Sequence, residues 1–502
     1  MEAHKAAVSA ISSQVSTFHQ RNVPFRLYHG ATNSTQSRTV DRARMLDTSR
    51  LSHVLAVNQA RKTCLVEPNV PMDRLVDAVL PFGLVPEVVM EFPGITVGGG
   101  FSGTAGESSG FKSGFFEDTV NWIEIVLGDG EVVRASPHDG GGGDDDDEHR
   151  SDLFWGAAGS FGTLGVITLL ELRLVEAKRF VELTYHPTTT PADALATLRR
   201  ACETAGNDYV DGILFAPDRG VVVTGRLTDE PAVGVKVQRF SRAHDPWFYI
   251  HAERTIGRDL EPVTEATPLR DYLFRYDRGA FFTGKYAFQY FLTPFNRITR
   301  YALDYFMHTR VMYHALHASG HASKYMIQDL LLPSATAEPF IDFVSRNLNF
   351  WPLWLCPFTV HRELSLHPRL PANNTKESEK PRTFVNVGVW GPGSTDYARF
   401  VEQNRQLERK VRELGGIKWL YAQAYYTEAE FTDIYDRQWY DELRERYHAT
   451  YLPTVYDKVK VDLTKADAYP ATWSDWLRRQ AWSTWPVSGV YGVLKVLYER
   501  EY

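Results

Sequence analysis

Residues 96–115, TVGGGFSGTAGESSGFKSGF, are the stretch that decides the fold. Seven of these residues are glycine, and small hydroxylated residues lie between them. Glycine lets backbone N–H groups approach an anion closely, and hydroxyl groups add further donors, so the segment is typical of a loop that binds a pyrophosphate. Apolar residues such as Val97 and Phe101 recur through the segment, which favours a packed loop over a flexible linker.

The first glycines of this stretch also match the pattern G-x-G-x-x-G, at residues 98–103. A Rossmann turn requires a strand before that pattern and a helix after it. Pro93 and Gly94 interrupt the approach, and the glycines that continue beyond Gly103 argue against a helix. We therefore predict a loop that passes over a cofactor rather than a Rossmann turn.

Two other segments have a similar composition. Residues 26–36, RLYHGATNSTQ, combine a tight turn with hydroxyl and amide donors, although such clusters are usually simple turns. Residues 151–168, SDLFWGAAGSFGTLGVIT, place four glycines before an apolar strand, where the backbone could reach a planar ring system.

The first part of the chain is predicted to contain short strands and turns. We expect strands at residues 65–70 and 166–175, a helix at 71–80, and a hairpin of 123–127 with 131–135 around Gly128-Asp129-Gly130. Residues 139–150, DGGGGDDDDEHR, cannot bury apolar surface and are predicted to form a mobile surface insertion.

Longer helical patterns appear after about Glu176. Helices are predicted at residues 191–205, 296–319, 395–414 and 428–446, with strands at 221–227 and 384–390. Aromatic residues are dense around residues 247–291, which fits either a large aromatic core or an apolar pocket for a bulky ligand.

Composition excludes several classes of protein. The 502-residue protein has a net charge of −7 and no dense basic cluster, which argues against nucleic acid as a partner. Three scattered cysteines argue against a disulfide framework or a zinc site. His314, His317 and His321 could share a helical face, but Gly320 should end the helix before the third, so we predict no metal site.

The three glycine-rich segments together resemble the flavin domain of the vanillyl-alcohol-oxidase superfamily. More specifically, the protein resembles its Δ24-sterol reductase branch, of the Diminuto/Dwarf1 type. The stretches that carry this resemblance include VEPNVPMDRLVDAVLPFGLVPEVVMEFPGITVGG, GTAGESSGFKSGFFEDTV, SDLFWGAAGSFGTLGVIT, KYMIQDLLLP, FWPLWLCP and YDRQWYDELRERYHATYLPTVYDKV.

The resemblance implies an α+β, two-domain protein with a PCMH-type FAD-binding fold and an α+β substrate (cap) domain. The FAD domain would cover residues 1–178 and the cap residues 179–450. Residues 451–502 would form a C-terminal segment that packs back on the FAD domain.

The resemblance also implies which residues bind FAD. They would be His29, Gly30, Ala31, Thr32, Asn33, Ser34, Thr35, Thr96, Val97, Gly98, Gly99, Gly100, Phe101, Ser102, Gly103, Thr104, Ala105, Gly106, Glu107, Ser108, Lys112, Gly162, Thr163, Gly165, Val166 and Ile167. Many relatives attach FAD covalently through a histidine in a G-x-G-H-S pattern of the first loop. Asn33 takes that position here, so we expect the FAD to be non-covalent.

Reduction of an isolated carbon–carbon double bond needs a proton as well as the hydride that a reduced flavin supplies, so a general acid is expected. Tyr440, in the resembling block QWYDELRE, is the first candidate, and Tyr286 and His448 are alternatives. A tyrosine that merely packs on a helix face is the competing interpretation of Tyr440.

The leading hypothesis is an NADPH-dependent reductase of a Δ24-type double bond in a sterol or related isoprenoid, with FAD as cofactor. The alternatives are an FAD oxidase of a small alcohol, sugar or lactone that uses O₂, and a non-catalytic sterol-binding protein. The first sixteen residues lack the apolar core of a signal peptide, and no run approaches the roughly 18 apolar residues of a membrane span. We expect a cytoplasmic protein, or a peripheral one in contact with the cytosolic face of the endoplasmic reticulum.

Overall fold

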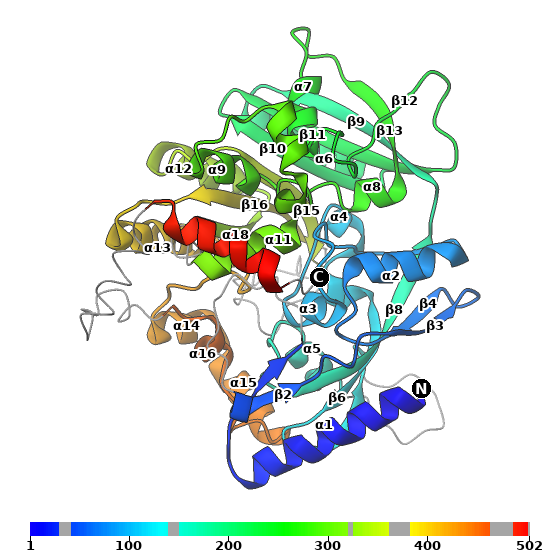
Figure 1. Cartoon of the computed structure of the whole chain (residues 1–502), viewed down its shortest axis with the longest axis vertical. Helices are drawn as coiled ribbons and strands as arrows, with labels where there is room; N and C mark the ends of the chain where they lie inside the picture. The colour runs from blue at the N-terminus through cyan, green and yellow to red at the C-terminus, as the bar shows by residue number, and fades with distance from the viewer. Residues whose placement is uncertain (30–41, 139–149, 320–324, 361–381, 462–484, 500–502) are drawn as a thin grey trace, which may run out of the picture.

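The computed structural model describes residues 1–29, 42–138, 150–319, 325–360, 382–461 and 485–499. Within these residues the protein forms two α+β units that are stacked along the long axis of the molecule (Figure 1). The first unit is built on a six-stranded sheet and the second on a nine-stranded sheet. The α+β class predicted from the sequence is confirmed.

The first sheet is antiparallel and has β8 at its centre. Its strands are β3 (Val54–Asn58), β4 (Thr63–Val66), β5 (Leu84–Pro86), β6 (Val120–Val126), β7 (Val132–Ala135) and β8 (Val166–Glu176). β8 pairs with β4, β5 and β6, and its first five residues are all buried, as expected of an apolar run in the middle of a sheet. The predicted hairpin is confirmed, because β6 and β7 pair and Gly130 turns with φ of 100°.

The helix α1 (Glu2–Gln20), which was not predicted from the sequence, covers part of this sheet. Val8, Ile11 and Val15 are buried along one of its faces at helical spacing. Its buried His4 contacts the carboxylates of Glu67, at 2.8 Å, and Glu124, at 3.1 Å. A small parallel pair, β1 (Arg26–Tyr28) with β2 (Met45–Asp47), and the helices α2 (Met72–Val79) and α5 (Ser151–Ala157) complete the unit.

The second sheet runs in the order β12-β13-β9-β11-β10-β15-β16-β14-β17 and is antiparallel except between β12 and β13. Its strands are β9 (Phe180–Thr188), β10 (Tyr209–Ala216), β11 (Arg219–Thr228), β12 (Lys236–Val237), β13 (Val263–Pro268), β14 (Tyr325–Pro333), β15 (Leu353–Val360), β16 (Arg382–Pro392) and β17 (Ile417–Lys418). The helices α6 (Pro191–Glu203), α12 (Ala337–Asn347) and α13 (Tyr397–Glu413) pack on one face, over a core that includes Val387 and Phe340. The alternate residues of the strands point to the opposite face, toward the first unit.

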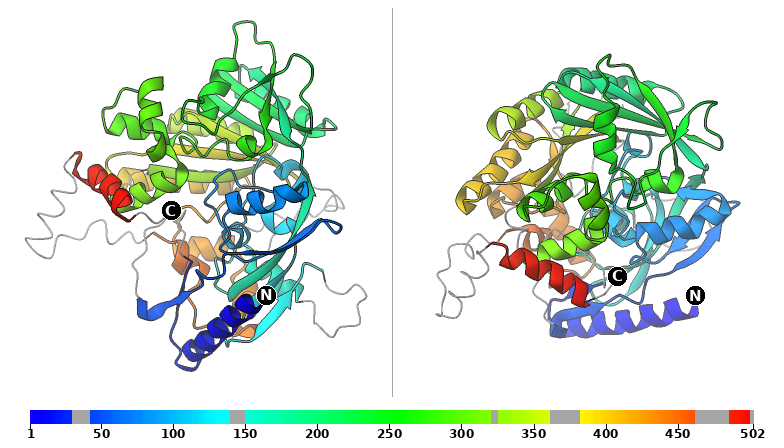
Figure 2. Two further views of the ribbon diagram at one scale, coloured as in Figure 1. Left: turned by 45° about the vertical axis from the view of Figure 1, so that its right-hand side comes forward. Right: turned by 45° about the horizontal axis from the view of Figure 1, so that its top comes forward.

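A layer of helices lies beside this sheet. It consists of α7 (Phe248–Thr255), α8 (Leu269–Leu273), α9 (Thr283–Tyr290), α10 (Arg297–Ala302), the 3-10 helix η4 (Asp304–Met307), α11 (Thr309–Ser319) and α18 (Val487–Glu499). Both views in Figure 2 show α18 lying alongside α11. None of the helices in the described ranges combines the length and the apolar character of a membrane span.

The polypeptide returns to the first unit through α14 (Glu428–Ile434), α15 (Arg437–Arg446) and α16 (Val455–Val459). Tyr447 donates a hydrogen bond to Asp152 Oδ1 at 2.7 Å, and Tyr451 donates one to the carbonyl of Gly128 at 2.8 Å. The boundary expected at residue 450 therefore differs from the structure, in which the return begins near residue 428. The final helix α18 packs on α11 rather than on the first unit.

Two helices predicted as continuous are broken in the structure. Asp277 accepts hydrogen bonds from the backbone N–H and the hydroxyl of Thr309, which starts α11 as a separate helix after η4. Asp436 caps Trp439 N at 3.1 Å and starts α15 separately from α14. A helical periodicity of apolar residues can continue through such caps, so the sequence pattern did not reveal them.

No helix directly follows Gly103, as expected, but the loop predicted for the glycine-rich stretch contains two short helices that were not predicted. Residues 97–102 form the short helix α3 (Val97–Ser102), and a second turn, α4 (Gly110–Ser113), follows. Val97 and Phe101 are fully buried, and the Thr96 hydroxyl caps the helix. Tertiary packing and the cap offset the low helix propensity of glycine here.

A buried ion pair ties the second sheet to the helices beside it. The guanidinium of Arg275 lies 2.8 Å from Asp211 Oδ2, and neither side chain is exposed by more than 1%. Tyr276 Oη and Trp354 Nε1 also donate hydrogen bonds to the same carboxylate oxygen, at 2.8 and 3.2 Å. Removal of the carboxylate would leave a buried cation and two donors without their acceptor.

We expect Asp211→Ala to destabilise the fold by about 3–5 kcal/mol, since the uncompensated guanidinium would remain buried. Thermal unfolding followed by circular dichroism would show a clearly lower midpoint. The exposed pair Arg346–Asp342, with N···O of 3.0 Å, offers a control, because Arg346→Ala should change the midpoint little. Equal midpoints for Asp211→Ala and wild type would contradict this account of the buried pair.

Candidate active site

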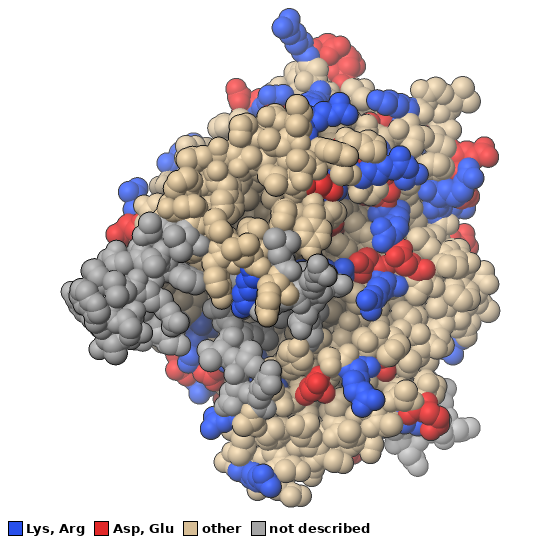
Figure 3. Space-filling view, viewed as in Figure 1, with Lys and Arg blue, Asp and Glu red and all other residues tan. Residues whose placement is uncertain are grey.

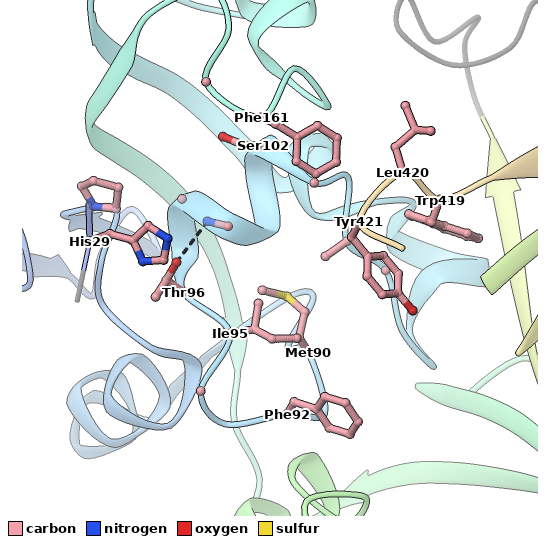
Figure 4. Close-up of a pocket in the computed structure, with 18 of the residues that line it drawn as sticks. His29, Met90, Phe92, Ile95, Thr96, Ser102, Phe161, Trp419, Leu420 and Tyr421 are labelled. Carbon is pink, nitrogen blue, oxygen red and sulfur yellow. Dashed lines mark hydrogen bonds between the residues drawn. The ribbon is translucent and has the colours of Figure 1, made fainter. Parts of the chain in front are cut away.

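A cavity of about 350 Å³ lies where the two units meet. Backbone and side chains of the first unit form one wall, while the second sheet and residues 419–421 form the other. In Figure 4, Trp419, Leu420 and Tyr421 lie on the opposite side of the view from Thr96, with Met90, Ile95 and Phe161 between them. The three glycine-rich segments of the sequence meet here, the first of them through Arg26, Leu27 and His29.

The helix α3 brings the glycine backbone close to the cavity. The Thr96 hydroxyl accepts a hydrogen bond from Gly99 N at 3.2 Å and so fixes the start of the helix. A Cβ atom at Gly98 would lie 2.6 Å from Pro68 Cβ, and one at Gly103 would lie 2.9 Å from the carbonyl oxygen of Gly99. Glycine at these positions lets backbone, rather than side chains, form the wall.

The third segment approaches from the start of β8. Gly162 has φ of 69°, and a Cβ atom at Gly165 would lie 2.5 Å from the carbonyl oxygen of Val126. The Lys458 ammonium from α16 donates a hydrogen bond to the carbonyl of Phe161 at 2.7 Å. The returning segment of the protein therefore holds this edge of the cavity in place.

Glu107 has a supporting role behind the cavity. Its buried carboxylate accepts hydrogen bonds from Ser108 N, Ser108 Oγ and Ser109 N at 2.6 to 3.0 Å. The carbonyl of Ser108 in turn accepts a bond from Val210 N of β10 at 2.8 Å. Glu107 and Ser108 thus join the glycine-rich loop to the second sheet rather than face the cavity.

The structure brings together many of the residues predicted to bind FAD. The cavity is lined by His29, Thr96, Gly98, Gly99, Ser102, Gly103, Ala105, Gly106, Gly162, Gly165, Val166 and Ile167. The remaining described residues of this set do not line the cavity; they are Val97, Gly100, Phe101, Thr104, Glu107, Ser108, Lys112 and Thr163. Lys112 among them is exposed and pairs with Asp208 at 2.9 Å. Gly30, Ala31, Thr32, Asn33, Ser34 and Thr35 lie outside the described residues, as does the insertion at 139–149.

The three candidates for the general acid do not line the cavity. Tyr440 Oη donates to Thr163 Oγ1 at 2.6 Å and accepts from Val455 N at 3.2 Å, so it holds the returning segment in place. Tyr286 lies beside Tyr325, and His448 lies near Asp129 with its side chain half exposed. The competing interpretation, that Tyr440 is a packing residue, agrees with its position.

The opposite wall of the cavity was not predicted from the sequence. This wall is aromatic and contains a small polar group, and its members are Phe281, Tyr313, Asp329, Trp354, Phe358, Asn386, Trp390, Trp419 and Tyr421. The alternation of valines with other residues along β16 was the sequence signal that could have revealed part of this wall. Val385, Val387 and Val389 belong to the core beneath the helices, so Asn386 and Trp390 must point the other way.

Asp329 is the acidic centre of the polar group. Its carboxylate accepts hydrogen bonds from Tyr421 Oη and from Asn386 Nδ2, the latter at 2.9 Å. Burial raises the pKa of the Asp329 carboxyl, and the hydrogen bonds from Tyr421 and Asn386 offset this only in part. Burial also raises the pKa of the Tyr421 hydroxyl well above its ordinary value, and the adjacent Asp329 raises it further.

A second buried acid, Glu91, lies at the boundary between the two walls. Burial raises the pKa of the Glu91 carboxyl well above its usual value, and Glu107 raises it further, against the lowering effect of Arg275. The Arg275 guanidinium lies 3.8 Å from Glu91 Oε1. Both acids of the cavity therefore bind their protons more tightly than exposed carboxyl groups do.

The donors and acceptors of the cavity fit FAD. The close-packed glycine backbone offers a surface that a pyrophosphate can approach. Glu91 Oε1 and Asn386 Oδ1 are buried acceptors for which the described residues provide no hydrogen-bond partner. An isoalloxazine ring carries an N–H group that such an acceptor can bind, and its apolar faces suit the aromatic wall.

We expect Gly103→Val to lower the FAD content of the purified protein at least tenfold, because its Cβ would displace the carbonyl of Gly99 at the cavity wall. The ratio of flavin to protein absorbance measures this content. Gly257→Ala is the control, since its Cβ would meet only the end of the flexible Asp259 side chain, away from the cavity. Full flavin content in Gly103→Val would show that this backbone does not hold the cofactor.

Comparisons with known proteins agree with the geometry. A family model described as an FAD binding domain matches residues 6–136, which include α3 and its glycines. The Delta(24)-sterol reductase of Homo sapiens is 29% identical over 418 residues, which span 82% of this protein and 76% of the human one. The Arabidopsis thaliana Delta(24)-sterol reductase is 28% identical over 463 residues, which span 85% and 78% of the two proteins. A homologue of the same enzyme from Caenorhabditis elegans is 27% identical over 430 residues, which span 84% and 79%. The protein is therefore an FAD-dependent enzyme that is similar, over most of its length, to the Delta(24)-sterol reductases of animals and plants.

Proposed function

We propose that the protein reduces an isolated carbon–carbon double bond of Δ24 type in the aliphatic tail of a sterol or related isoprenoid, with NADPH as the hydride donor and FAD as the carrier. One observation supports this proposal above the others. A glycine-lined wall faces an aromatic wall across a single cavity, and the aromatic wall contains one hydrogen-bonded acid, Asp329. The names of the relatives supply the class of substrate.

The aromatic wall suits a hydrocarbon substrate. The centroid of the Phe281 ring lies 5.0 Å from that of Trp354 and 5.3 Å from that of Trp390, and all three side chains are buried. Large rigid rings offer apolar contact to an aliphatic tail and exclude water from the cavity. Exclusion of water strengthens the interactions of the few polar groups that remain, including those of Asp329.

The reaction needs a proton donor from the protein. When bound, reduced FAD supplies a hydride, and the second carbon of the double bond must receive a proton. We assign the proton to the pair Asp329 and Tyr421, because both line the cavity and they are joined by a hydrogen bond. In this assignment the Tyr421 hydroxyl gives its proton to the carbon and recovers one from the Asp329 carboxyl.

Asn386 and β14 keep this pair in position. Asn386 Nδ2 binds Asp329 Oδ1, while its own strand β16 pairs with β14 through the register Asp329 to Gly388. A Cβ atom at Gly388 would lie 2.9 Å from Asp329 Oδ1, so only glycine opposite Asp329 leaves room for the carboxyl. The acid is thus attached to a rigid sheet rather than to a loop.

We expect NADPH to bleach the flavin of the purified protein under anaerobic conditions. Addition of a detergent-solubilised Δ24 sterol should then restore the oxidised flavin spectrum, with formation of the sterol saturated at that bond. Bleaching by polyols, followed by peroxide production in air, would instead support the oxidase alternative and overturn the reductase assignment.

The proton pair can be tested separately from the cofactor. Asp329→Asn and Tyr421→Phe should each slow reoxidation of the reduced flavin by sterol by about 10²–10⁴-fold, while its reduction by NADPH stays near the wild-type rate. Tyr313→Phe is the control, because Tyr313 also lines the cavity but lies outside the pair.

The same pair predicts a pH dependence. The protonated carboxyl is the active form, so the sterol half-reaction should slow as the pH rises through the raised pKa of Asp329. Stopped-flow measurement across a pH series would show this falling limb in wild type and its disappearance in Asp329→Asn. An unchanged limb in that variant would assign the proton to another group.

A further inference from the structure

An apolar surface covers the outer helices of the second unit. Its members are large apolar residues with side chains more than two-fifths exposed, and we call them the apolar face: Leu292, Ile298, Tyr301, Tyr305, Trp485, Val490, Tyr491, Leu494 and Tyr498. Exposure reaches 78% at Ile298 and 89% at Tyr498. In Figure 3 the part of this surface over α9 and α18 shows few charged side chains. Soluble monomers rarely expose so many neighbouring apolar residues without a binding role.

The helix α18 shows why this surface is unusual. Ser488, Gly489 and Gly492 are on the side that packs against α11 and the end of α9. The opposite side presents Val490, Leu494 and Tyr498 at a spacing of four residues. A surface helix normally places polar residues on its outward face, so α18 has the composition of a helix with apolar partners on both sides.

The part of the apolar face on α18 adjoins the end of α9, although the two segments are far apart in sequence. Trp485 Nε1 donates a hydrogen bond to the carbonyl of Tyr290 at 2.6 Å. A Cβ atom at Gly489 would lie 2.5 Å from the Tyr290 ring, and one at Gly492 would lie 2.7 Å from the carbonyl oxygen of Ala315. Small residues therefore let α18 sit directly on α9 and α11, next to the exposed Leu292.

The charges around the apolar face differ from those of the whole protein. Lys285 and Arg297 are exposed on the same helices and Lys495 of α18 is half-buried, whereas Arg300 is buried and Arg310 pairs with Asp73 of the first unit at 3.1 Å. The exposed positive charges beside the face contrast with a net charge of −7 for the protein. Aromatic and aliphatic residues with a basic border are typical of helices that lie in a membrane interface.

The apolar face is also close to the cavity. Tyr313 of α11 lines the cavity, whereas Ala315 and Ser319 of the same helix contact α18. One helix thus separates the apolar face from the cavity proposed to bind an apolar substrate. A ligand dissolved in a bilayer would be only a helix diameter, about 10 Å, from that cavity.

We propose that the apolar face docks on the surface of a lipid bilayer that contains anionic phospholipids. Val490, Leu494, Tyr498 and their neighbours enter the boundary between headgroups and acyl chains, while Lys285 and Arg297 contact the headgroups. The role of this contact in delivering a sterol rests on the proposed function, but the lipid binding itself does not. Two independent measurements can therefore separate the two proposals.

Flotation of the FAD-loaded protein with sterol-free vesicles tests the surface. The wild-type protein should bind phosphatidylcholine vesicles that contain phosphatidylserine several-fold more strongly than vesicles of phosphatidylcholine alone. The double variant Ile298→Ser/Leu494→Ser should lose about tenfold or more in partitioning, because two exposed aliphatic side chains no longer enter the lipid. Lys285→Glu/Arg297→Glu should abolish the preference for phosphatidylserine.

Val233→Ser provides the matched control, because Val233 is a fully exposed aliphatic residue outside the apolar face, and this variant should bind like wild type. Absence of wild-type binding, or equal binding by the Ile298→Ser/Leu494→Ser variant, would overturn the proposal. The proposal would also be overturned if the wild-type protein formed a concentration-dependent dimer and did not bind vesicles, and if the Ile298→Ser/Leu494→Ser variant stayed monomeric. That result would assign the face to a second copy of the protein. Reduction of a detergent-solubilised sterol with NADPH, measured in the same variants, reports on the proposed function alone.

Discussion

The structure depends on one buried guanidinium. Arg275 is fully buried between Asp211 of the second sheet and Glu91 at the cavity wall, and its guanidinium lies over the Tyr272 ring at 4.1 Å from the centroid. A cation in this position is tolerable only with its carboxylate and ring partners in place. Because Glu91 belongs to the first unit and Asp211 to the second, the same residue fixes the units relative to each other.

Because Arg275 fixes the two units relative to each other, one wall of the cavity can consist of glycine backbone and the other of aromatic and polar side chains. The first unit contributes backbone, held by Thr96 and by the glycines around it. The second contributes side chains from a rigid sheet, with Asp329 placed by pairing of β14 with β16. Each wall is built by its own sheet, so the shared cavity requires only that the units meet at a fixed distance. Phe358 of the second sheet also joins the two units, because its ring lies against both Gly106 and Gly110 of the first unit.

The glycine-rich wall could be predicted from the sequence because its composition is unusual. Thr96, Gly98, Gly103 and Gly165 stand out among their neighbours, and they line the cavity. Asp329 and Tyr421 could not be found in the same way, because each lies among mostly apolar neighbours of ordinary composition, and their hydrogen bond joins positions 92 residues apart. The breaks in the helices and the position of Tyr440 away from the cavity could not be predicted for a similar reason. Capping by Asp277 and Asp436 and the bond from Tyr440 to Thr163 all depend on contacts that apolar periodicity does not reveal.

The return of the polypeptide to the first unit restricts how the molecule can move. The backbone crosses between the units at Glu176–Phe180 and again between Lys418 and Glu428, and Lys458 anchors the returning segment to Phe161. It crosses once more between α16 and α18, because α18 packs on α11 of the second unit. Several separate connections of this kind restrict rotation of one unit about the other. The second unit therefore cannot swing away as a singly hinged lid, and exchange of ligands has to use the ends of the cavity or local shifts of its lining.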